Sequence, residues 1–169
     1  MLVIRDETRS DHAAIREVIQ RAFGGDAEAI LVDRLREDEV VVASLVAEEH
    51  GKIAGHILFS ELHLETSRGR IPAVSLAPVS VLPAQQRSGI GSALVRAGLE
   101  ACRSRGISVV AVLGHPEYYP RFGFSAALAA RLHGPYSGNA WMALELVPGA
   151  LHAVNTRVRY PAAFEAVGH

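Results

Sequence analysis

The spacing of apolar residues predicts two early helices between a first strand and a three-strand meander. Leu2–Arg5 has the pattern of a short strand. A first helix is predicted after Ser10 or Asp11, either of which can cap it, and a glycine pair ends it. A second helix is predicted over Asp26–Arg36. Three longer apolar runs then alternate with polar turns, which is typical of an antiparallel meander. These runs are Val40–Ala47, Ile53–Leu64 and Ile71–Leu82.

The second half of the chain predicts one crossover helix followed by a parallel strand. Apolar residues form a single stripe along Ile90–Arg105, and Ile107–Leu113 is a fully apolar run after it. A strand reached through a helix is expected to lie parallel to the strand before that helix. Trp141–Leu146 is a late strand, Pro116–Phe122 is a short helix or turn, and Ser125–Asn139 has no assignable pattern.

This order of elements predicts an α+β (mixed α/β) fold with a mixed, mostly antiparallel sheet and helices on both faces. A doubly wound nucleotide fold is excluded because a long meander precedes the only clear crossover. The 169-residue chain is expected to form one domain over residues 1–146, with a packed or partly disordered tail over 147–169.

Composition excludes several classes of partner and site. A net charge of −1 gives no bulk attraction for nucleic acid. Cys102 is the only cysteine, so neither an internal disulfide nor a cysteine-based zinc site is possible. We find no signal-peptide pattern at the start and no apolar stretch of about 18 residues, and therefore expect a cytoplasmic protein without a membrane span.

The glycine turn Gln86–Gly91, between the third meander strand and the crossover helix, carries the most chemical information. Its backbone N–H groups lie at the positive end of a helix, which suits a phosphate group. Gly89 and Gly91 remove side chains where a ligand must approach the backbone, Gln86 can hold the loop by a hydrogen bond, and Arg87 adds charge. The six residues alone fit a phosphate site and a plain turn equally well. The patterns of ATP-binding and NAD-binding loops are absent.

Pro78 interrupts the strand that leads into this turn. Proline cannot donate to a sheet ladder, so it is expected at an edge or at a bulge. A bulge would leave backbone groups near Val79 and Val81 unpaired, and an extended, amide-rich ligand arm could pair with them. A simple edge proline is the alternative, but a bulge beside a phosphate loop is the more coherent interpretation.

With these features the chain resembles the GNAT superfamily of acetyl-CoA-dependent N-acetyltransferases, most closely its YhbS-like branch. Gln86–Gly91 fits the family's Gln/Arg-x-x-Gly-x-Gly/Ala loop for the CoA pyrophosphate. Leu76–Pro83 is similar to its bulged central strand beside the pantetheine arm, and Gly114–Phe124 to the segment after its parallel strand. The resemblance covers roughly residues 2–146. It implies acetyl-CoA as co-substrate, bound by Val79, Ser80, Val81, Gln86, Arg87, Ser88, Gly89, Ile90, Gly91 and Ser92.

The resemblance also implies direct transfer of the acetyl group to a primary amine of a small molecule or peptide. Tyr119 corresponds to the tyrosine that protonates the CoA thiolate, and a phenol can donate to a group whose pKa is about 8–9. The alternative is that Tyr118 and Tyr119 only cap the core. Ser75 stands where many relatives carry a catalytic glutamate, so the general base is unassigned. A catalytically silent acyl-CoA-binding module or sensor therefore remains the alternative function, and a longer acyl-CoA is a further possibility.

For the other reactive residues, the sequence favours structural roles. Glu61, His63 and Glu65 are expected at a solvated strand end, and the histidines lack metal-ligand spacing, so we expect no metal site. Cys102 lies beside the apolar stripe of the crossover helix and is expected to be a core thiol. The Trp141 strand is a possible exposed edge at which a second chain could pair to form a homodimer.

Overall fold

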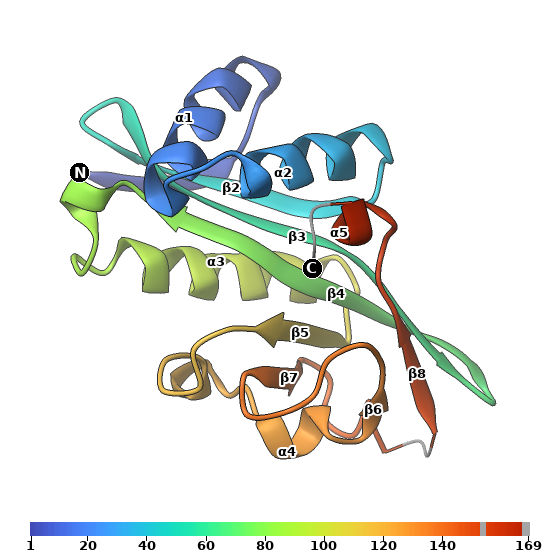
Figure 1. Ribbon diagram of the computed structural model, residues 1–169. Coiled ribbons are helices and arrows are strands. Elements are labelled where there is room, and N and C mark those ends of the chain that lie inside the picture. Colours follow the sequence, from blue (N-terminus) through green and yellow to red (C-terminus); the bar gives the residue numbers. More distant parts are fainter. Residues whose placement is uncertain (153–154, 167–169) are drawn as a thin grey trace. The chain divides into compact units, whose positions relative to one another are not determined.

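The strands predicted from the apolar runs are present, and backbone hydrogen bonds order them β1-β2-β3-β4-β5-β7 in a mixed, mostly antiparallel sheet (Figure 1). The neighbours β1 and β2, β2 and β3, and β5 and β7 run antiparallel, whereas β4 and β5 run parallel, as the crossover predicted. Their bounds are β1 Leu2–Asp6, β2 Val41–Glu49, β3 Lys52–Thr66, β4 Gly69–Val81, β5 Val109–Leu113 and β7 Trp141–Glu145.

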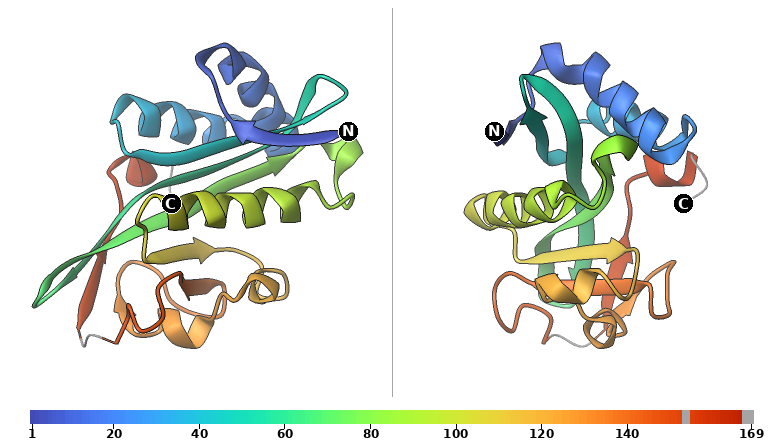
Figure 2. Two further views of the ribbon diagram at one scale, coloured as in Figure 1. Left: turned by 180° about the vertical axis from the view of Figure 1, so that it is seen from behind. Right: turned by 90° about the vertical axis from the view of Figure 1, so that its left-hand side faces the viewer.

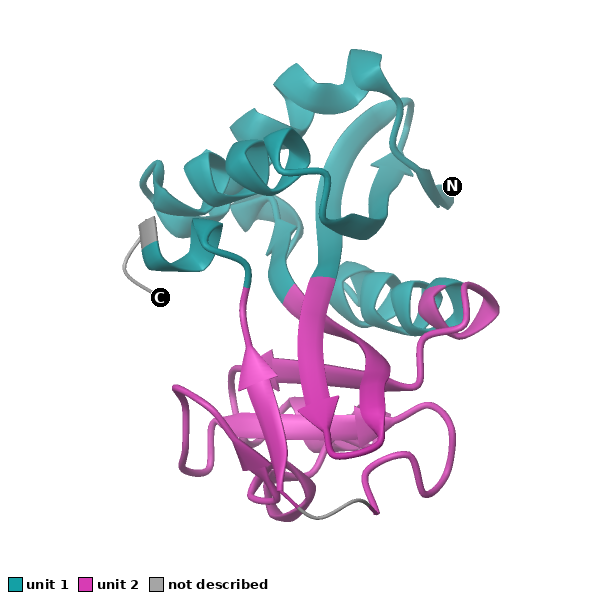
Figure 3. Ribbon diagram, turned by 90° about the vertical axis from the view of Figure 1, so that its right-hand side faces the viewer, with its two compact units in different colours: residues 1–60, 77–101, 161–169 teal, residues 61–76, 102–160 magenta. Residues whose placement is uncertain are grey.

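The computed structural model describes residues 1–152 and 155–166. The expectation for the tail therefore falls partly on 153–154 and 167–169, which lie outside the described residues. The chain divides into two compact units that are not continuous in sequence (Figure 3). Unit 1 comprises Met1–Ser60, Ala77–Ala101 and Pro161–His169, and unit 2 comprises Glu61–Leu76 and Cys102–Tyr160.

In unit 1, helices cover both faces of the strands (Figures 1 and 2). Helices α1 (His12–Phe23) and α2 (Ala27–Glu37) lie on one face, and the unit 1 part of α3 (Ile90–Ser104) lies on the other. Gly24 ends α1 in a left-handed conformation with a φ of 72°. The short helix α5 (Ala163–Ala166) lies against α2, so part of the C-terminal tail is packed.

The start of α1 differs from the sequence prediction. Asp11 immediately precedes the helix, but its carboxylate does not bond to the first turn of α1. It accepts two hydrogen bonds from the Arg5 guanidinium, at 2.8 and 3.1 Å, and one from the Thr8 backbone N–H at 2.7 Å. These bonds hold the pKa of Asp11 well below its usual range, and they fix the short 3-10 helix η1 (Arg9–Asp11) against β1.

Unit 2 contains the elements that had no sequence pattern. The segment without an assignment holds helix α4 (Ala126–Ala129) and the two-residue strand β6 (Leu132–His133), and the tail supplies strand β8 (Thr156–Arg159). Strand β8 pairs antiparallel with β3 and parallel with β6. The buried core of unit 2 gathers around Trp141, with residues such as Leu64, Val109, Leu151 and Val158.

One edge of β7, the strand at which the sequence analysis allowed a second chain to pair, is in part occupied by the protein's own backbone. The Ser125 N–H donates to the Ala143 carbonyl at 2.9 Å, and the Ala143 N–H donates to the Ser125 carbonyl at 3.1 Å. Trp141 itself is buried. Among the described residues, none of the helices combines the length and the apolar character that crossing a bilayer requires.

Candidate active site

The glycine turn in unit 1 is held by hydrogen bonds from its own residues. The short 3-10 helix η2 (Pro83–Gln85) leads into it from β4, and the Leu82 N–H donates to the Ala54 carbonyl of β3 at 2.9 Å. The Gln86 side-chain amide donates to the Val81 carbonyl at 3.1 Å, and the Ser88 hydroxyl donates to the Gln85 carbonyl. The predicted anchoring role of Gln86 is confirmed.

The backbone of this turn takes left-handed conformations and ends at the start of α3. Arg87 has a φ of 65°, and Gly89 has a φ of 91°. A φ near 91° is one that only glycine adopts without strain. The first helical bond runs from the Ala93 N–H to the Gly89 carbonyl at 3.0 Å, so the N–H groups of Ile90 and Gly91 have no acceptor inside the helix. A Cβ atom on Gly89 would meet nothing within 4 Å, so the position of a side chain there is open space.

Two further glycines fix the position of α3 in unit 1. A Cβ atom on Gly55 of β3 would lie 2.9 Å from Leu94 Cδ1 and 3.1 Å from Ile90 Cγ2. A Cβ atom on Gly98 of α3 would lie 2.3 Å from Cε2 of Phe59. The helix therefore approaches β3 closely at both points. This packing fixes the first turn of α3, which follows directly after the glycine turn. These contacts could not be predicted from the sequence, because they depend on which strand residues face the helix.

The strand segment predicted for the pantetheine arm is the end of β4, also in unit 1. Val79 and Val81 are half-buried, and Ser80 is buried. The Ser80 hydroxyl has no hydrogen-bond partner among the described residues. The Ala77–Pro78 peptide is cis. The bulge expected at Pro78 stays a prediction.

Tyr119, the predicted acid, lies in unit 2 at the start of the 3-10 helix η3 (Tyr119–Phe122). Its ring packs on Gly114, where a Cβ atom would lie 2.4 Å from Cε2, and it meets the Phe124 ring edge to face with centroids 5.6 Å apart. Burial, with a smaller contribution from Tyr118, raises the pKa of Tyr119 to about 12. The phenol is therefore protonated at neutral pH, as a proton donor must be.

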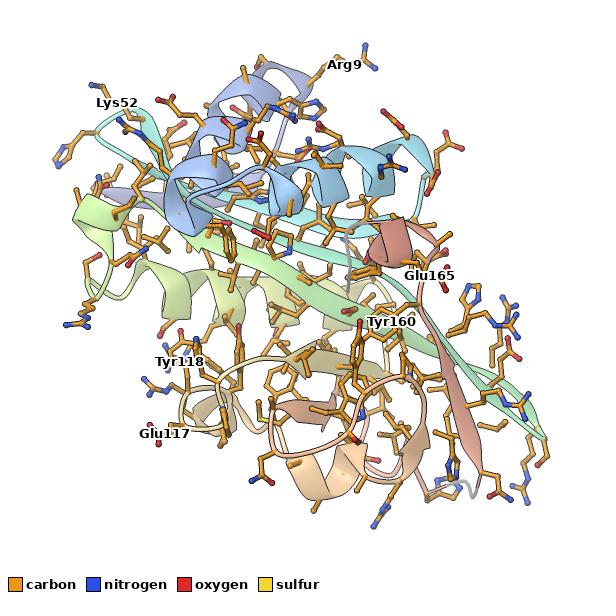
Figure 4. All side chains as sticks on the ribbon, viewed as in Figure 1. Arg9, Lys52, Glu117, Tyr118, Tyr160 and Glu165 are labelled. Atoms are coloured by element: carbon orange, nitrogen blue, oxygen red, sulfur yellow. The ribbon has the colours of Figure 1, made fainter. Side chains whose placement is uncertain are left out.

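Tyr118 has different surroundings. Its half-buried ring stacks under the Arg121 guanidinium, with the guanidinium carbon 4.4 Å from the ring centroid, and the Arg121 Nε–H donates to the Tyr118 carbonyl at 2.9 Å. Figure 4 shows Tyr118 beside the exposed Glu117. These contacts favour a packing role for Tyr118, separate from that of Tyr119.

The other residues considered from the sequence lie in structural settings. In unit 2, Ser75 is buried and hydrogen-bonded to Tyr160, and burial raises the pKa of the Cys102 thiol to about 12. Glu65 faces two arginines, Arg70 at 3.7 Å and Arg159 at 3.8 Å. Within the described residues there is no group of three or more histidine, cysteine, aspartate or glutamate side chains arranged to hold a metal ion.

A partly buried polar cluster in unit 1, which the sequence analysis missed, surrounds Glu7. The carboxylate of Glu7 accepts hydrogen bonds from Arg36 of α2 at 2.9 Å and from the Ser44 hydroxyl of β2, and His12 of α1 contacts it at 2.8 Å. The His56 Nε2 atom of β3 lies 2.8 Å from the Ser44 hydroxyl and 3.6 Å from Glu7. Burial opposes ionisation of Glu7, but these partners outweigh it and hold its pKa well below its usual range. The signal available in the sequence was a histidine inside an apolar strand.

Comparison with known proteins identifies the family and its fold. Residues 3–127 match the model of the acetyltransferase (GNAT) domain. The chain belongs to this family. It is 45% identical to the N-acetyltransferase YjhQ of Escherichia coli K12 over 118 residues. These residues make up 69% of this chain and 65% of YjhQ, so the match spans just under two thirds of that relative. It is 33% identical to the N-acetyltransferase YhbS of the same strain, over 94% of this chain and 96% of YhbS.

Two solved GNAT structures resemble the whole fold. The crystal structure of Escherichia coli YhbS in complex with CoA has a TM-score of 0.88 and 32% identity, covering 97% of this chain and 92% of that chain. The crystal structure of a GNAT acetyltransferase from Brucella melitensis in complex with acetyl-CoA has a TM-score of 0.81 and 36% identity, covering 97% of this chain and 98% of that chain. The predicted GNAT fold and YhbS-like branch are confirmed.

Proposed function

We propose that this GNAT enzyme transfers the acetyl group of acetyl-CoA to a primary amine by direct attack. The observation that carries the proposal is the glycine turn, whose left-handed Gly89 precedes the open N-terminus of α3. Helix N-termini and turn amides bind pyrophosphate oxygens well. The CoA and acetyl-CoA complexes of the related YhbS and Brucella melitensis structures support the choice of this ligand.

In this proposal the residues predicted from the sequence take specific roles. The pyrophosphate binds the amides from Arg87 to Ser92, with Gln86 holding the loop, and the pantetheine arm follows Val79–Val81. The list of donor-binding residues is thus Val79, Ser80, Val81, Gln86, Arg87, Ser88, Gly89, Ile90, Gly91 and Ser92.

Tyr119 acts at the leaving group. The amine nitrogen attacks the thioester carbonyl carbon, a C–N bond forms, and the C–S bond breaks with its electron pair on sulfur. The Tyr119 phenol, protonated at neutral pH, donates to that sulfur. The nitrogen releases one proton to solvent and the Tyr119 phenolate regains one from solvent, so the products are an N-substituted acetamide and free CoA thiol.

The proposal is tested by measuring acetyl-CoA consumption with a panel of primary amines, beside calorimetric binding of CoA. An active enzyme releases thiol at a rate that depends on the amine. Tight CoA binding without turnover on any amine would favour the silent acyl-CoA sensor. Failure to bind CoA would contradict both functions.

The loop itself is tested by Gly89→Glu, which places a like charge against the pyrophosphate. We expect it to abolish detectable CoA binding. Gly89→Ala is the matched control, because its Cβ atom has open space and only the left-handed backbone is penalised. Alanine should weaken binding far less than glutamate. Unchanged affinity in Gly89→Glu would remove the pyrophosphate from this loop.

A further inference from the structure

In unit 2, the ring of Tyr119 occupies the place where any other residue at position 114 would carry its side chain. Gly114 directly follows β5, and a Cβ atom there would lie 2.4 Å from Cε2, 3.0 Å from Cδ2 and 3.4 Å from Cζ of Tyr119. Gly114 is not one of the glycines with a left-handed φ, so its backbone conformation does not itself require glycine. The neighbouring ring is what requires it.

The sheet of unit 2 fixes the backbone of Gly114. The Gly114 N–H donates to the Ala140 carbonyl at 2.9 Å, and the preceding Leu113 pairs with Trp141 of β7, a residue of the buried core. A side chain at position 114 would therefore displace the Tyr119 ring more easily than the strand. The displacement is about 1 Å, the difference between 2.4 Å and an ordinary contact of 3.4 Å.

Three aromatic rings of the same segment confine the Tyr119 ring further. The buried Phe124 packs edge to face with it at a centroid distance of 5.6 Å, and Tyr118 does so at 5.1 Å. Phe122 is tilted against it at 6.4 Å. Pairs of this kind have preferred orientations, and only 6% of Tyr119 is exposed. The ring is therefore held in one position by its packing.

This packing, and not a hydrogen bond, determines where the Tyr119 hydroxyl lies. Burial is the larger influence on the pKa of Tyr119 and Tyr118 is the smaller, and no hydrogen bond to a described residue contributes. A proton donor must lie within hydrogen-bond reach of the atom that it protonates. A ring displaced by about 1 Å would carry the phenol oxygen away from that position.

We propose that Gly114 and Phe124 are positioning residues for Tyr119, which fix its phenol where it can donate to the leaving sulfur of CoA. Gly114 provides the space in which the ring lies, and Phe124 packs against the ring within that space. Both act through the position of the ring. Their role rests on the proposed acetyl transfer, because Tyr119 is the acid of that reaction.

A double-mutant cycle on the full-length enzyme tests whether Gly114 acts through the Tyr119 hydroxyl. We expect Gly114→Ala to lower kcat by about 10²-fold, because a misplacement of about 1 Å can cost that much. The KM for the amine and the CoA dissociation constant should match those of wild type. In the Tyr119→Phe background, which lacks the proton donor, Gly114→Ala should have no further effect. A second loss of the same size there would overturn the positioning role.

Gly134→Ala is the matched control for overpacking in unit 2. A Cβ atom on Gly134 would lie 2.8 Å from Cβ of Val158, and Gly134 also lacks a left-handed φ. At a temperature where both variants are folded, Gly134→Ala should keep the kcat of wild type. An equal loss of kcat in Gly114→Ala and Gly134→Ala would reflect overpacking alone and would overturn the role of Gly114.

Phe124→Leu tests the position of the same ring without adding atoms, and so also covers a Gly114→Ala variant that fails to fold. We expect kcat to fall by about 10-fold, less than in Gly114→Ala, because the ring gains freedom but is not pushed aside. Again there should be no further effect in the Tyr119→Phe background. A wild-type kcat in Phe124→Leu would overturn the role of Phe124.

Proton NMR of wild type tests the contact without turnover. One Hα atom of Gly114 points where the Cβ atom would stand, so we expect strong nuclear Overhauser effects between it and the Tyr119 ring protons. Their absence would overturn the inference. Wild type that acetylates no amine overturns the proposed function and the positioning role with it. Active wild type, with a reduced rate in Tyr119→Phe and a full rate in Gly114→Ala, overturns the role of Gly114 alone.

Discussion

At the scale of single residues, glycine serves two separate physical needs in this GNAT enzyme. Gly89 is required for its left-handed backbone and has open space around its α-carbon. Gly98 has an ordinary helical backbone but no space, because the Phe59 ring occupies the position of a side chain. Sequence patterns reveal the first kind, since turns are local. They do not reveal the second, since the neighbour that needs the space lies 39 positions away in the sequence.

Tyr119→Phe is expected to lower kcat by about 10²-fold while leaving the CoA dissociation constant unchanged, because only the proton donor is lost. A discontinuous assay of released CoA thiol measures kcat, and calorimetry measures the CoA dissociation constant. The raised pKa of about 12 also predicts that wild-type activity does not fall through ionisation of Tyr119 below about pH 11. Tyr118→Phe is the matched control, and an equal loss in both variants would contradict the assignment.

At the scale of elements, α3 connects the packing of unit 1 to its proposed chemistry. The same helix that presents its N-terminus to the glycine turn rests on Gly55 and carries Gly98 against Phe59. Its apolar stripe predicted the helix and its buried face, and the loop pattern together with the family resemblance led to the proposed CoA site. The depth at which it rests on β3 could not be predicted, because it depends on contacts between residues distant in the chain.

Gly98→Ala should therefore push α3 away from β3. We expect a loss of about 1–3 kcal/mol in the free energy of unfolding from overpacking, together with weaker CoA binding. Urea unfolding and calorimetry measure both. Gly25→Ala is the control, since its Cβ atom meets nothing within 4 Å and its backbone has no positive φ. Full stability and affinity in Gly98→Ala would show that the helix position does not set the loop.

The short elements were the least predictable part of the fold. Strand β6 has two residues, Leu132 and His133, whose hydrogen-bond partners Thr156 and Arg157 lie 24 residues away. Such pairings leave no period in the sequence. The buried His56 was similarly hidden, since a lone histidine in an apolar strand predicts neither its partners nor its tautomer.

At the scale of the whole molecule, the polar cluster makes stability depend on pH. The pKa of His56 is lower in the folded protein than its ordinary value of 6.5. Below pH 6.5 the unfolded chain therefore binds a proton that folded His56 does not, and stability falls as the pH drops. Glu7 and Asp11 have lowered pKa values, so their contribution is present above their ordinary values of 4.5 and 3.8 and is lost at lower pH.

Between pH 4.5 and 6.5, His56 is therefore the one of these three groups whose contribution to stability changes most with pH. We expect wild type to lose stability across it with an added slope of up to about 1.4 kcal/mol per pH unit compared with His56→Gln. Urea unfolding at several pH values measures the difference. Identical slopes in the two proteins would contradict a neutral, buried His56 in the folded state.

Lys52 is the only lysine of the chain, and it begins β3 at the exposed β2–β3 turn (Figure 4). It lines a groove of about 770 Å³ with Leu82 and Gln85, the residues that lead into the glycine turn. Acetyl-CoA slowly acylates amines without enzymatic help, and most proteins offer it many. In this chain such non-enzymatic acetylation of lysine side chains is confined to Lys52. Peptide mass spectrometry of Lys52 therefore reports how much acetyl the enzyme has taken up itself, and Lys52→Arg removes that background from any search for the true acceptor.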